Sequence, residues 1–515
     1  MKEIVERVWD VIVIGTGVGG GTAGRALAEA GASVLSLQKG RQGFRTERQG
    51  LDPVMADPVA RAVRGFWPDP VHATINGRQQ TFFAPLGCGT GGSSVFYAAT
   101  LERPAPHDLD AGSTHPGGGW PVGYEAMRPW FDAAEAMYRV HGEPDPLSDI
   151  PCPRLGTPAE PSAGDTAILD RLRANGLHPY RLHTAIANTP GCLDCLGVKC
   201  PRVCKMDGRS AGLEPALATG RAALLDECEV VALRGEPHRI THVDALHRGE
   251  PIVLRARRFV LAAGALSSPR LLLASRSEAW PRGCANEHDQ VGRHLMFHAN
   301  ELFAIWPRDA GHGSQPSKAV GLRDLYTLEG RPMGMVQAMG VNVSYGLIAH
   351  FLRQRLADSS LKALSALAPV AATLASLALG QAKLFVGLLE DLPYAENRVV
   401  FDARHPGRIV FEYTIHPELL ERRALFRKAI RRAFRGLRPV FVDWRPELNY
   451  GHACGTLRAG TDPATSVVNA DGRAHGLDNL YVVDASYFPT STGVNPSLTI
   501  AANALRVAHL MKAET

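Results

Sequence analysis

The chain has 515 residues, of which 45% are apolar and 21% are charged, and its formal net charge is +5. A chain of this length exceeds one compact core, so we expect two or three domains or one large α/β body. The charge is too mild to indicate a nucleic-acid partner, and we expect none. The apolar run that begins at Trp9 enters a glycine motif instead of a signal-peptide cleavage site. The expected location is the cytoplasm; membrane association and export with a partner stay open.

The first chemical motif follows a short apolar run. Residues 9–14 (WDVIVI) suit a strand buried on both faces, and a second strand is expected at 33–37. Between them Gly15, Gly17 and Gly20 form G-x-G-x-x-G at the start of a helix, which predicts a dinucleotide site. Gly15 permits the tight turn, Gly17 lets the backbone approach a pyrophosphate, and Gly20 allows close helix–strand packing. We expect the pyrophosphate at the amino end of the helix.

The acidic residue that usually holds the adenosine ribose is missing. About 20 residues beyond the glycines, the chain has Gln38 followed by Lys39. An amide can hydrogen-bond a ribose hydroxyl, but without the charge-assisted strength of a carboxylate. We therefore expect Gln38 at the ribose, with either weaker adenosine binding or a phosphate contact from Lys39.

Later segments indicate that the dinucleotide is a flavin. A second glycine-rich loop at 85–104 contains Gly89, Gly92 and Ser93, and close backbone approach along a flavin favours such residues. This loop resembles the first signature of the glucose–methanol–choline (GMC) oxidoreductase family, in the form of its cholesterol-oxidase-like and bacterial iron–sulfur sugar dehydrogenase members. Three further segments resemble the same family, whereas roughly 300–390 matches no segment of it. These segments are 119–138, 258–275 and 451–508.

The GMC resemblance implies FAD and assigns residues to it. Covalent attachment in some members uses a His near the first signature, where this chain has Phe96 and Tyr97, so non-covalent FAD is expected. The resemblance places one residue at the adenine, two at the pyrophosphate and ribityl chain, and two beside the flavin ring. In that order they are Val231, then Asp484 and Ala485, then Asn495 and Pro496.

A catalytic pair is expected in the C-terminal block. Oxidation of an alcohol needs a base whose pKa lies near neutrality, which favours His. His452, in the run GHACGT, stands where the GMC family has its catalytic His. Asn495 falls on the partner position, where an amide orients the substrate hydroxyl but cannot replace the base. The resemblance therefore assigns proton transfer to His452 and positioning to Asn495.

Four of the nine cysteines lie within thirteen residues, at Cys192, Cys195, Cys200 and Cys204. Their spacing, C-x2-C-x4-C-x3-C, lets four thiolates converge on one soft metal and is similar to iron–sulfur runs. The last three match the spacing in sugar-oxidising GMC dehydrogenases, which implies a three-iron or four-iron cluster. Structural zinc, and disulfides or free thiols, stay open as alternatives. A one-electron centre beside a flavin favours a dehydrogenase over an oxidase.

Two stretches of the middle region have helical patterns. Residues 363–380 carry no charge, which favours a buried or pocket-covering helix; a membrane or quinone contact and a spanning helix stay open. Residues 418–439 are strongly basic. We expect a solvated helix face there, with a docking patch for an acidic electron carrier or a lipid surface as the alternative.

The predicted fold class is α/β, with two domains and a bridge. Residues 1–150, 205–300 and 445–515 are expected to form a Rossmann-like FAD-binding domain from discontinuous segments. A Cys-rich bridging loop at 151–204 leads to an α+β substrate domain at 301–444 with an antiparallel sheet.

The predicted function is oxidation of an alcohol or sugar CH–OH group by an FAD-dependent dehydrogenase. Electrons are expected to leave through the cysteine-bound cluster to an external acceptor. The alternatives are an oxygen-using alcohol oxidase with structural cysteines, a non-redox lyase on the same flavin scaffold, and an electron-transfer subunit that is inert without partners. The expected ligand is a small alcohol or sugar. An acceptor protein or quinone, a small partner subunit and peripheral membrane contact stay open.

Overall fold

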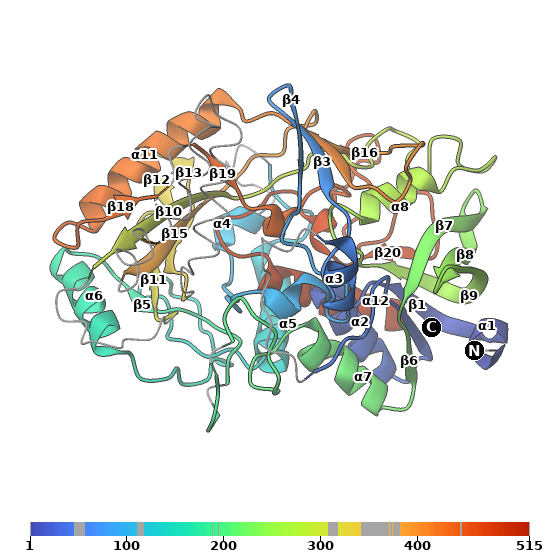
Figure 1. Cartoon of the computed structure of the whole chain (residues 1–515), viewed down its shortest axis with the longest axis horizontal. Coiled ribbons are helices and arrows are strands. Elements are labelled where there is room, and N and C mark those ends of the chain that lie inside the picture. The colour runs from blue at the N-terminus through green and yellow to red at the C-terminus, as the bar shows by residue number, and fades with distance from the viewer. Residues whose placement is uncertain are drawn as a thin grey trace.

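The computed structural model describes eight segments and two isolated positions, Val370 and Thr373. The segments are 2–45, 57–110, 118–187, 189–193, 195–306, 318–340, 382–442 and 445–513. Two seven-stranded sheets lie toward opposite ends of the long axis, and both termini lie at the end of the first sheet (Figure 1). The apolar stretch 363–380 falls outside the described residues except for those two positions.

The first sheet has the order β6-β2-β1-β9-β8-β7, with β20 also paired with β9. Its β1, β2, β6, β9 and β20 run parallel, and β7 and β8 extend the sheet as an antiparallel pair. Residues 11–14 of β1 are all buried, as expected for a strand covered on both faces. The strands are β1 (Val8–Ile14), β2 (Val34–Leu37), β6 (Ala222–Leu225), β7 (Cys228–Glu236), β8 (Arg239–His247), β9 (Glu250–Leu261) and β20 (Leu480–Val482).

A group of helices packs on this sheet, and glycines allow them to approach closely. Helix α2, which follows β1, packs against the C-terminal helix α12 and against the π-helix η2. A Cβ on Gly21 would lie 2.3 Å from the Gly208 carbonyl oxygen, so that contact requires glycine. The helices are α2 (Val18–Glu29), α5 (Tyr124–Met137), η2 (Gly208–Leu213), α7 (Glu214–Ala218) and α12 (Ser497–Ala513).

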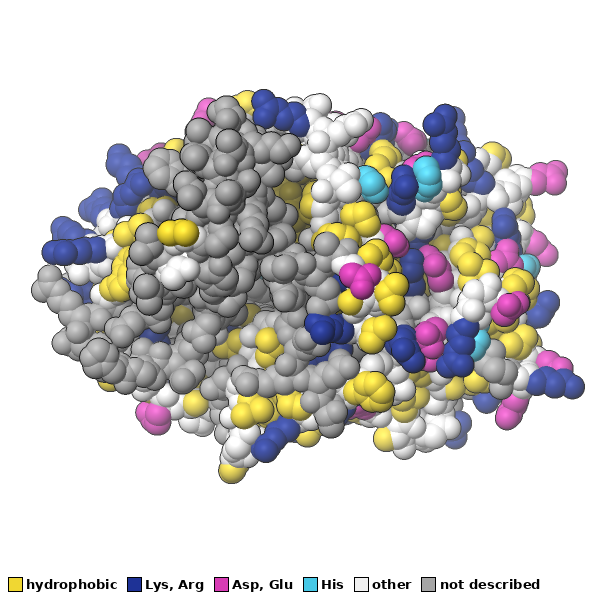
Figure 2. Space-filling model, in the orientation of Figure 1, with side chains coloured by type: hydrophobic (Ala, Val, Ile, Leu, Met, Phe, Trp, Pro, Cys, Tyr) yellow, Lys and Arg dark blue, Asp and Glu magenta, His cyan; other side chains and the backbone are white. Residues whose placement is uncertain are grey.

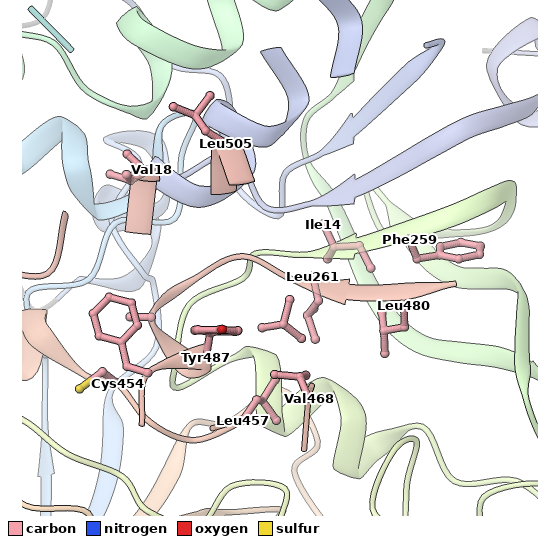
Figure 3. Close-up of a cluster of buried hydrophobic side chains, with 14 of the residues drawn as sticks. Ile14, Val18, Phe259, Leu261, Cys454, Leu457, Val468, Leu480, Tyr487 and Leu505 are labelled. Carbon is pink, nitrogen blue, oxygen red and sulfur yellow. The ribbon is translucent and has the colours of Figure 1, made fainter. Parts of the chain in front are cut away.

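The core of this half joins both ends of the chain. Figure 3 shows side chains of β1, α2 and β9 lying together with side chains of the C-terminal block, which includes β20 and most of α12. Ile14 and Leu261 are examples from neighbouring strands, and Leu480 and Leu505 come from the last 40 residues. Burial of apolar side chains contributes about 1.5–3 kcal/mol each. The C-terminal block is therefore part of the same core as the strands of the first sheet.

The second sheet is antiparallel, with the order β18-β10-β15-β14-β11-β5 and with β19 paired with β10. Helices α6 (Ala163–Ala174) and α11 (Pro417–Ala433) cover one face, where their apolar side chains share a core with the strands. The strands are β5 (Tyr180–Arg181), β10 (Ala299–Ile305), β11 (Val320–Leu322), β14 (Val336–Ala338), β15 (Lys383–Leu389), β18 (Val440–Phe441) and β19 (Glu447–Leu448).

The strongly basic helix is α11, and part of its charge faces inward. Arg422 is 2% exposed and donates to two backbone carbonyls and to Glu418. Arg423 and Arg427 both bind the fully buried carboxylate of Glu301 on β10. The expected solvated face is thus wrong for these three arginines, which hold the helix to the sheet. Lys and Arg side chains do remain visible at the end where α11 lies (Figure 2).

A third sheet connects distant segments in the order β16-β17-β3-β4, and β17 runs parallel to β3. Its strands are β3 (Val71–Ile75), β4 (Arg78–Phe82), β16 (Arg398–Val400) and β17 (Val410–Tyr413). The remaining elements are short: α1 (Lys2–Glu6), α3 (Pro58–Val63), η1 (Gly92–Phe96), α4 (Pro106–Leu109), α8 (Ser268–Ala274), β12 (Thr327–Leu328), β13 (Arg331–Pro332), η4 (Tyr450–His452) and η5 (Ala485–Tyr487).

The predicted fold class is confirmed: a Rossmann-like α/β unit is built from discontinuous segments, beside an antiparallel sheet with covering helices. The domain boundaries stay a prediction. The segment 151–204 contains helix α6 and strand β5, which were not foreseen. In the described part of the chain, no helix combines the length and the hydropathy that a membrane crossing requires.

Candidate active site

A cavity of about 440 Å³ extends from the first sheet to the second. Four parallel strands of the first sheet reach it with residues at or just after their carboxyl ends, where open α/β sheets bind ligands. These residues are Ile14, Leu37, Ala262 and Asp484. Strands β10, β14 and β15 of the second sheet supply the opposite wall. We call the first part the nucleotide half and the second part the substrate half.

The nucleotide half is open where a phosphate would lie. Helix α2 begins after Gly17, and no side chain caps its first turn, so backbone N–H groups there can bind an anion. A Cβ on Gly17 would meet no atom within 4 Å. A Cβ on Gly92 would lie 3.2 Å from the Gly17 Cα, so the two glycine loops face each other closely. This narrow, uncharged cradle of backbone fits the pyrophosphate of a dinucleotide.

Several predicted cofactor residues line the cavity and others do not. Gly20 lies behind the loop, where a Cβ would be 1.9 Å from the Gly15 carbonyl oxygen, in keeping with its expected packing role. Gly89 and Val231 do not line the cavity. Cys228, Glu229 and Val230 line it instead of Val231, whose side chain is 38% exposed. The lining residues from the prediction are Gly15, Gly17, Gln38, Gly92, Ser93, Asp484, Ala485, Asn495 and Pro496.

Gln38 is buried, and its amide holds the glycine loops together. Its Oε1 accepts from the backbone N–H of Thr16 (3.0 Å) and from the Thr16 hydroxyl (2.6 Å). Its Nε2 donates to the carbonyl of Cys88 in the second loop. The expected contact with a ribose therefore competes with three hydrogen bonds inside the protein.

A carboxylate does line the adenosine end, but it comes from another strand. Glu229 on β7 accepts from Lys39 Nζ at 2.9 Å and lies 3.6 Å from Arg270. Lys39 also lies over the ring of Trp67, 4.3 Å from its centroid. Glu229 is thus better placed than Gln38 to supply a charged acceptor for ribose hydroxyls. The lysine's expected phosphate contact competes with this ion pair.

Asp484 organises the turn beneath the cavity. Its carboxylate accepts from the backbone N–H of Gly264 (2.8 Å), from the Ser268 hydroxyl (2.5 Å) and from the backbone N–H of Ser486 (2.9 Å). These bonds join β9, α8 and η5 at one point. Asn495 and Pro496 lie just before α12, so the amino end of that helix also faces the cavity. A helix amino terminus stabilises negative charge placed beside it.

The predicted catalytic pair is assembled in the substrate half. His452 Nε2 lies 3.5 Å from Asn495 Nδ2, although 43 residues separate them in sequence. Asn495 Oδ1 accepts from Gln337 Nε2 at 2.9 Å, and Gln337 is 1% exposed. The amide of Asn495 is thus held by β14, and its N–H points toward the imidazole. Both side chains line the cavity.

A second histidine fixes the protonation pattern of the first. His298 is fully buried, and its Nε2 lies 2.8 Å from the Thr492 carbonyl, which can only accept, so this Nε2 carries the proton. In a neutral His298 the other nitrogen, Nδ1, must then accept. It lies 3.0 Å from His452 Nδ1, which therefore donates. His452 Nε2 is left without a proton and faces Asn495, as a base requires.

The electrostatic surroundings keep both imidazoles neutral. Burial lowers the pKa of His298, because the charged ring would lose its hydration. The pKa of His452 is held well below its usual range, first by burial and then by the positive charges that His298 and Lys318 can carry. The site therefore presents an unprotonated nitrogen over a wide range of pH.

The four clustered cysteines do lie together. Cys200 Sγ is 3.5 Å from Cys204 Sγ, and no disulfide joins any of the nine cysteines. Cys195, Cys200 and Cys204 are buried, and Cys192 packs against them. Burial and the neighbouring thiols raise the pKa of Cys204 to about 12. Among the described residues, no group of three or more Cys, His, Asp or Glu side chains is arranged to hold a metal ion. We therefore derive no step through a cluster.

Lys205 ties the cysteine loop to the cavity wall. It is fully buried, and its Nζ donates to the carbonyls of Val95 (3.0 Å), Tyr97 (3.3 Å) and Val198 (2.6 Å). Burial lowers its pKa to about 8. Because Tyr97 lines the cavity, the cysteines lie directly behind the wall of the nucleotide half.

The fold and the cavity define a Rossmann-type oxidoreductase with a dinucleotide site. Comparison with known proteins is more specific: profiles of the GMC oxidoreductase family match residues 10–300 and 393–504. The chain belongs to this family, which binds FAD, and the resemblance seen in the sequence is confirmed.

Relatives of the chain include both oxidases and dehydrogenases. Paromamine 6'-oxidase of Streptomyces fradiae is 29% identical over 98% of this chain and 91% of its own length. Fructose dehydrogenase large subunit of Gluconobacter japonicus is 25% identical over 97% of each chain. A solved structure of Aspergillus oryzae formate oxidase, made to study FAD modification, has a TM-score of 0.70 at 16% identity, covering 99% of both chains. The last comparison concerns the fold alone.

Sequence reasoning missed several residues of the substrate half. His298, Lys318, Asn300 and Gln337 all belong to the second sheet or its flanks and line or support the cavity. They lie in or beside the stretch that matches no family motif. No local pattern marks them, because only the sheet order β10-β15-β14-β11 brings them to one wall.

Proposed function

We propose that the protein is an FAD-dependent dehydrogenase that oxidises a CH–OH group of an alcohol or sugar. The observation that carries the proposal is the juxtaposition of an unprotonated imidazole nitrogen, on His452, with the fixed amide of Asn495 in a cavity that also contains the dinucleotide cradle. The relatives named above support the substrate class, because their names describe oxidation of sugars or related hydroxyl compounds.

The described residues fit FAD in both halves of the cavity. The backbone cradle of Gly17 and Gly92 would hold the pyrophosphate, and Glu229 would face the ribose. Asp484, Ala485 and the start of α12 would lie along the remainder of the cofactor. FAD, when bound, supplies the acceptor for the substrate's hydride.

The protein's own part of the reaction is proton handling and positioning. His452 Nε2 accepts the proton of the substrate hydroxyl, which the neutral tautomer imposed by His298 permits. The Asn495 amide donates to the substrate oxygen and fixes its direction. Gln337 holds that amide in place. The low pKa of His452 means that no proton must be lost from the enzyme before the substrate binds.

The relatives are named as oxidases or as dehydrogenases, which differ in their electron acceptor. For this protein we propose an external acceptor instead of oxygen. Support comes from the four cysteines behind the cavity wall, which lie together and have a sequence spacing similar to that of three-iron or four-iron iron–sulfur runs, although the described residues are not arranged to hold a metal ion. An acceptor protein or quinone, a small partner subunit and a peripheral membrane contact belong to the same proposal. The rival is an oxidase with structural cysteines, as in the name of paromamine 6'-oxidase.

One experiment tests each part separately. The protein is purified without oxygen, its visible spectrum is recorded, iron and acid-labile sulfide are assayed, and sugars and alcohols are then added. Bleaching of the flavin bands supports CH–OH oxidation, and a spectrum that no alcohol or sugar bleaches contradicts it in favour of a non-redox role. Iron and sulfide in stoichiometric amounts support the cluster. Flavin without iron, together with peroxide formed in equal amount to product, establishes the oxidase instead.

A further inference from the structure

Among the described residues that line the substrate half, Lys318 supplies an ammonium group that no carboxylate contacts. Lys318 lies two residues before β11, lines the cavity with His452 and Asn495, and is close enough to His452 to lower its pKa. Amide side chains in the same lining include those of Asn300 on β10 and Gln337 on β14. Lys318 is therefore part of the wall that a substrate would touch.

The other charged residues of the lining are already engaged. At the adenosine end, Glu229 is shared between Lys39 and Arg270. Asp484 accepts four hydrogen bonds beneath the flavin end. Among the described lining residues, no other acidic side chain is present, and Lys318 forms no ion pair with a described residue. Within the described part of the chain, the positive charge of Lys318 is thus not paired with a carboxylate.

Burial makes that charge costly. It lowers the pKa of Lys318 to about 7, and the only opposing influence is Glu102. That carboxylate is fully buried and already bound by Arg323 at 2.9 Å and by the Tyr180 hydroxyl at 3.0 Å. A lysine with no structural partner, kept inside an active-site cavity, gains most from an anion that arrives with the ligand.

We infer that Lys318 is a specificity-determining residue that binds a carboxylate on the substrate, so that the preferred substrate is a hydroxy acid or a sugar acid. This inference rests on the proposed oxidation of a CH–OH group at His452. The carboxylate and the reacting hydroxyl occupy one wall, the first at Lys318 and the second between His452 and Asn495. Asn300 and Gln337 line the same cavity, where their amide groups would offer hydrogen-bond partners to sugar hydroxyls.

The arrangement also makes the substrate assist its own oxidation. While Lys318 is unpaired, its charge opposes proton uptake by His452. A bound carboxylate cancels that charge and favours the imidazolium that forms when the hydroxyl proton is transferred. A neutral alcohol of the same shape leaves the repulsion in place. The acid should therefore gain in kcat as well as in KM.

The test compares matched substrates on the FAD-loaded enzyme. Gluconate is paired with sorbitol, and 6-hydroxyhexanoate with 1-hexanol, in anaerobic flavin reduction. The wild-type protein should prefer the acid of at least one pair. Lys318→Met should lower kcat/KM for that acid by about 10- to 150-fold, the equivalent of one charge-assisted hydrogen bond of 1.5–3 kcal/mol. For the neutral partner the same variant should raise kcat/KM and not lower it, because the charge that opposes proton uptake by His452 is removed. Lys318→Arg, which keeps the charge, should retain most of the preference.

A second readout needs no turnover. Benzoate, which has no hydroxyl to oxidise, should perturb the flavin absorbance of the wild-type and Lys318→Arg proteins and leave that of Lys318→Met unchanged. The inference is wrong if the wild-type protein prefers the neutral partners. It is also wrong if Lys318→Met lowers kcat equally for acids and neutral alcohols, because Lys318 would then serve the reacting oxygen. Benzoate binding with no alcohol oxidation of any kind would instead keep the anion site and overturn the proposed function.

Discussion

The two halves of the cavity differ in which part of the chain lines them, the backbone in one and side chains in the other. The nucleotide half is made mainly of backbone, with Gly17 and Gly92 leaving space that side chains would fill. The substrate half is made of side chains, in which His452, Asn495 and Gln337 form one hydrogen-bonded row. A backbone cradle depends on short sequence spacing and suits any cofactor phosphate. A row of side chains depends on tertiary pairing and can be specific for one substrate. Substitutions should therefore affect cofactor binding in one half and chemistry in the other.

The largest effect is expected at His452 in the substrate half. His452→Ala removes the base, and general-base catalysis contributes about 10²–10⁴-fold in rate. We expect the anaerobic rate constant of flavin reduction to fall by that factor, measured by stopped-flow absorbance. The FAD content per protein should stay unchanged, because the cradle is in the other half. A fall of less than tenfold, with full FAD content, would assign the proton transfer to another group.

His298 should come next, through its hydrogen bond to His452. His298→Leu removes the acceptor for His452 Nδ1, so the tautomer with a proton on Nε2 becomes populated and cannot act as a base. We expect kcat to fall by about tenfold, roughly the loss of one hydrogen bond of 0.5–1.5 kcal/mol. Steady-state kinetics with a neutral alcohol checks this.

The matched control for that change is His298→Gln. Its amide can accept from His452 Nδ1 and donate to the Thr492 carbonyl, so it should restore most of kcat. A merely structural role of His298 would instead make the two variants equally inactive and equally unstable to heat. Equal loss in both would contradict the tautomer argument.

In the nucleotide half, two glycines of the same motif should respond differently. Gly17→Ala places a methyl group where no protein atom lies within 4 Å, so the apoprotein should fold normally and bind FAD more weakly. Gly20→Ala places it 1.9 Å from a backbone oxygen and should lower the free energy of unfolding, by about 1–3 kcal/mol for an overpacked site. Thermal unfolding of both apoproteins and FAD titration separate the two effects. Normal FAD affinity in Gly17→Ala would show that the loop at Gly17 does not bind the pyrophosphate.

The sequence predicts the residues of the nucleotide half better than those of the substrate half. The glycine spacing at Gly15, Gly17 and Gly20 places the first loop, because the strand, turn and helix are adjacent in sequence. His452 and Asn495 were found through a resemblance and not through spacing. Gln38 shows the limit of local reasoning: it lines the cavity, but its amide bonds to Thr16 and Cys88, which only the folded chain brings near.

The residues that escaped prediction share one physical reason. Gln337 and Lys318 reach the cavity because β14 pairs with both β11 and β15, and the pairing with β15 joins residues as far apart in sequence as Gln337 and Val386. Likewise, Glu301 forms ion pairs with Arg423 and Arg427 of α11, which the sequence pattern places on a solvent-exposed helix face. Antiparallel pairing over long separations leaves no periodic signal of which polar side chain meets which partner.

The smallest expected effect is a difference in pH dependence between catalysis in the substrate half and FAD binding in the nucleotide half. A base accepts a proton only while neutral, and the pKa of His452 is held well below the ordinary histidine value of 6.5. As pH falls through 6.5, kcat/KM for a neutral alcohol should therefore stay level, and it should decline only at lower pH. Lys318→Met removes a positive charge beside the imidazole, which favours the imidazolium and should move this decline to higher pH. FAD affinity in the nucleotide half should not follow either profile. A decline centred at or above 6.5 in the wild-type protein would mean that His452 is solvated and not buried in a row of fixed partners.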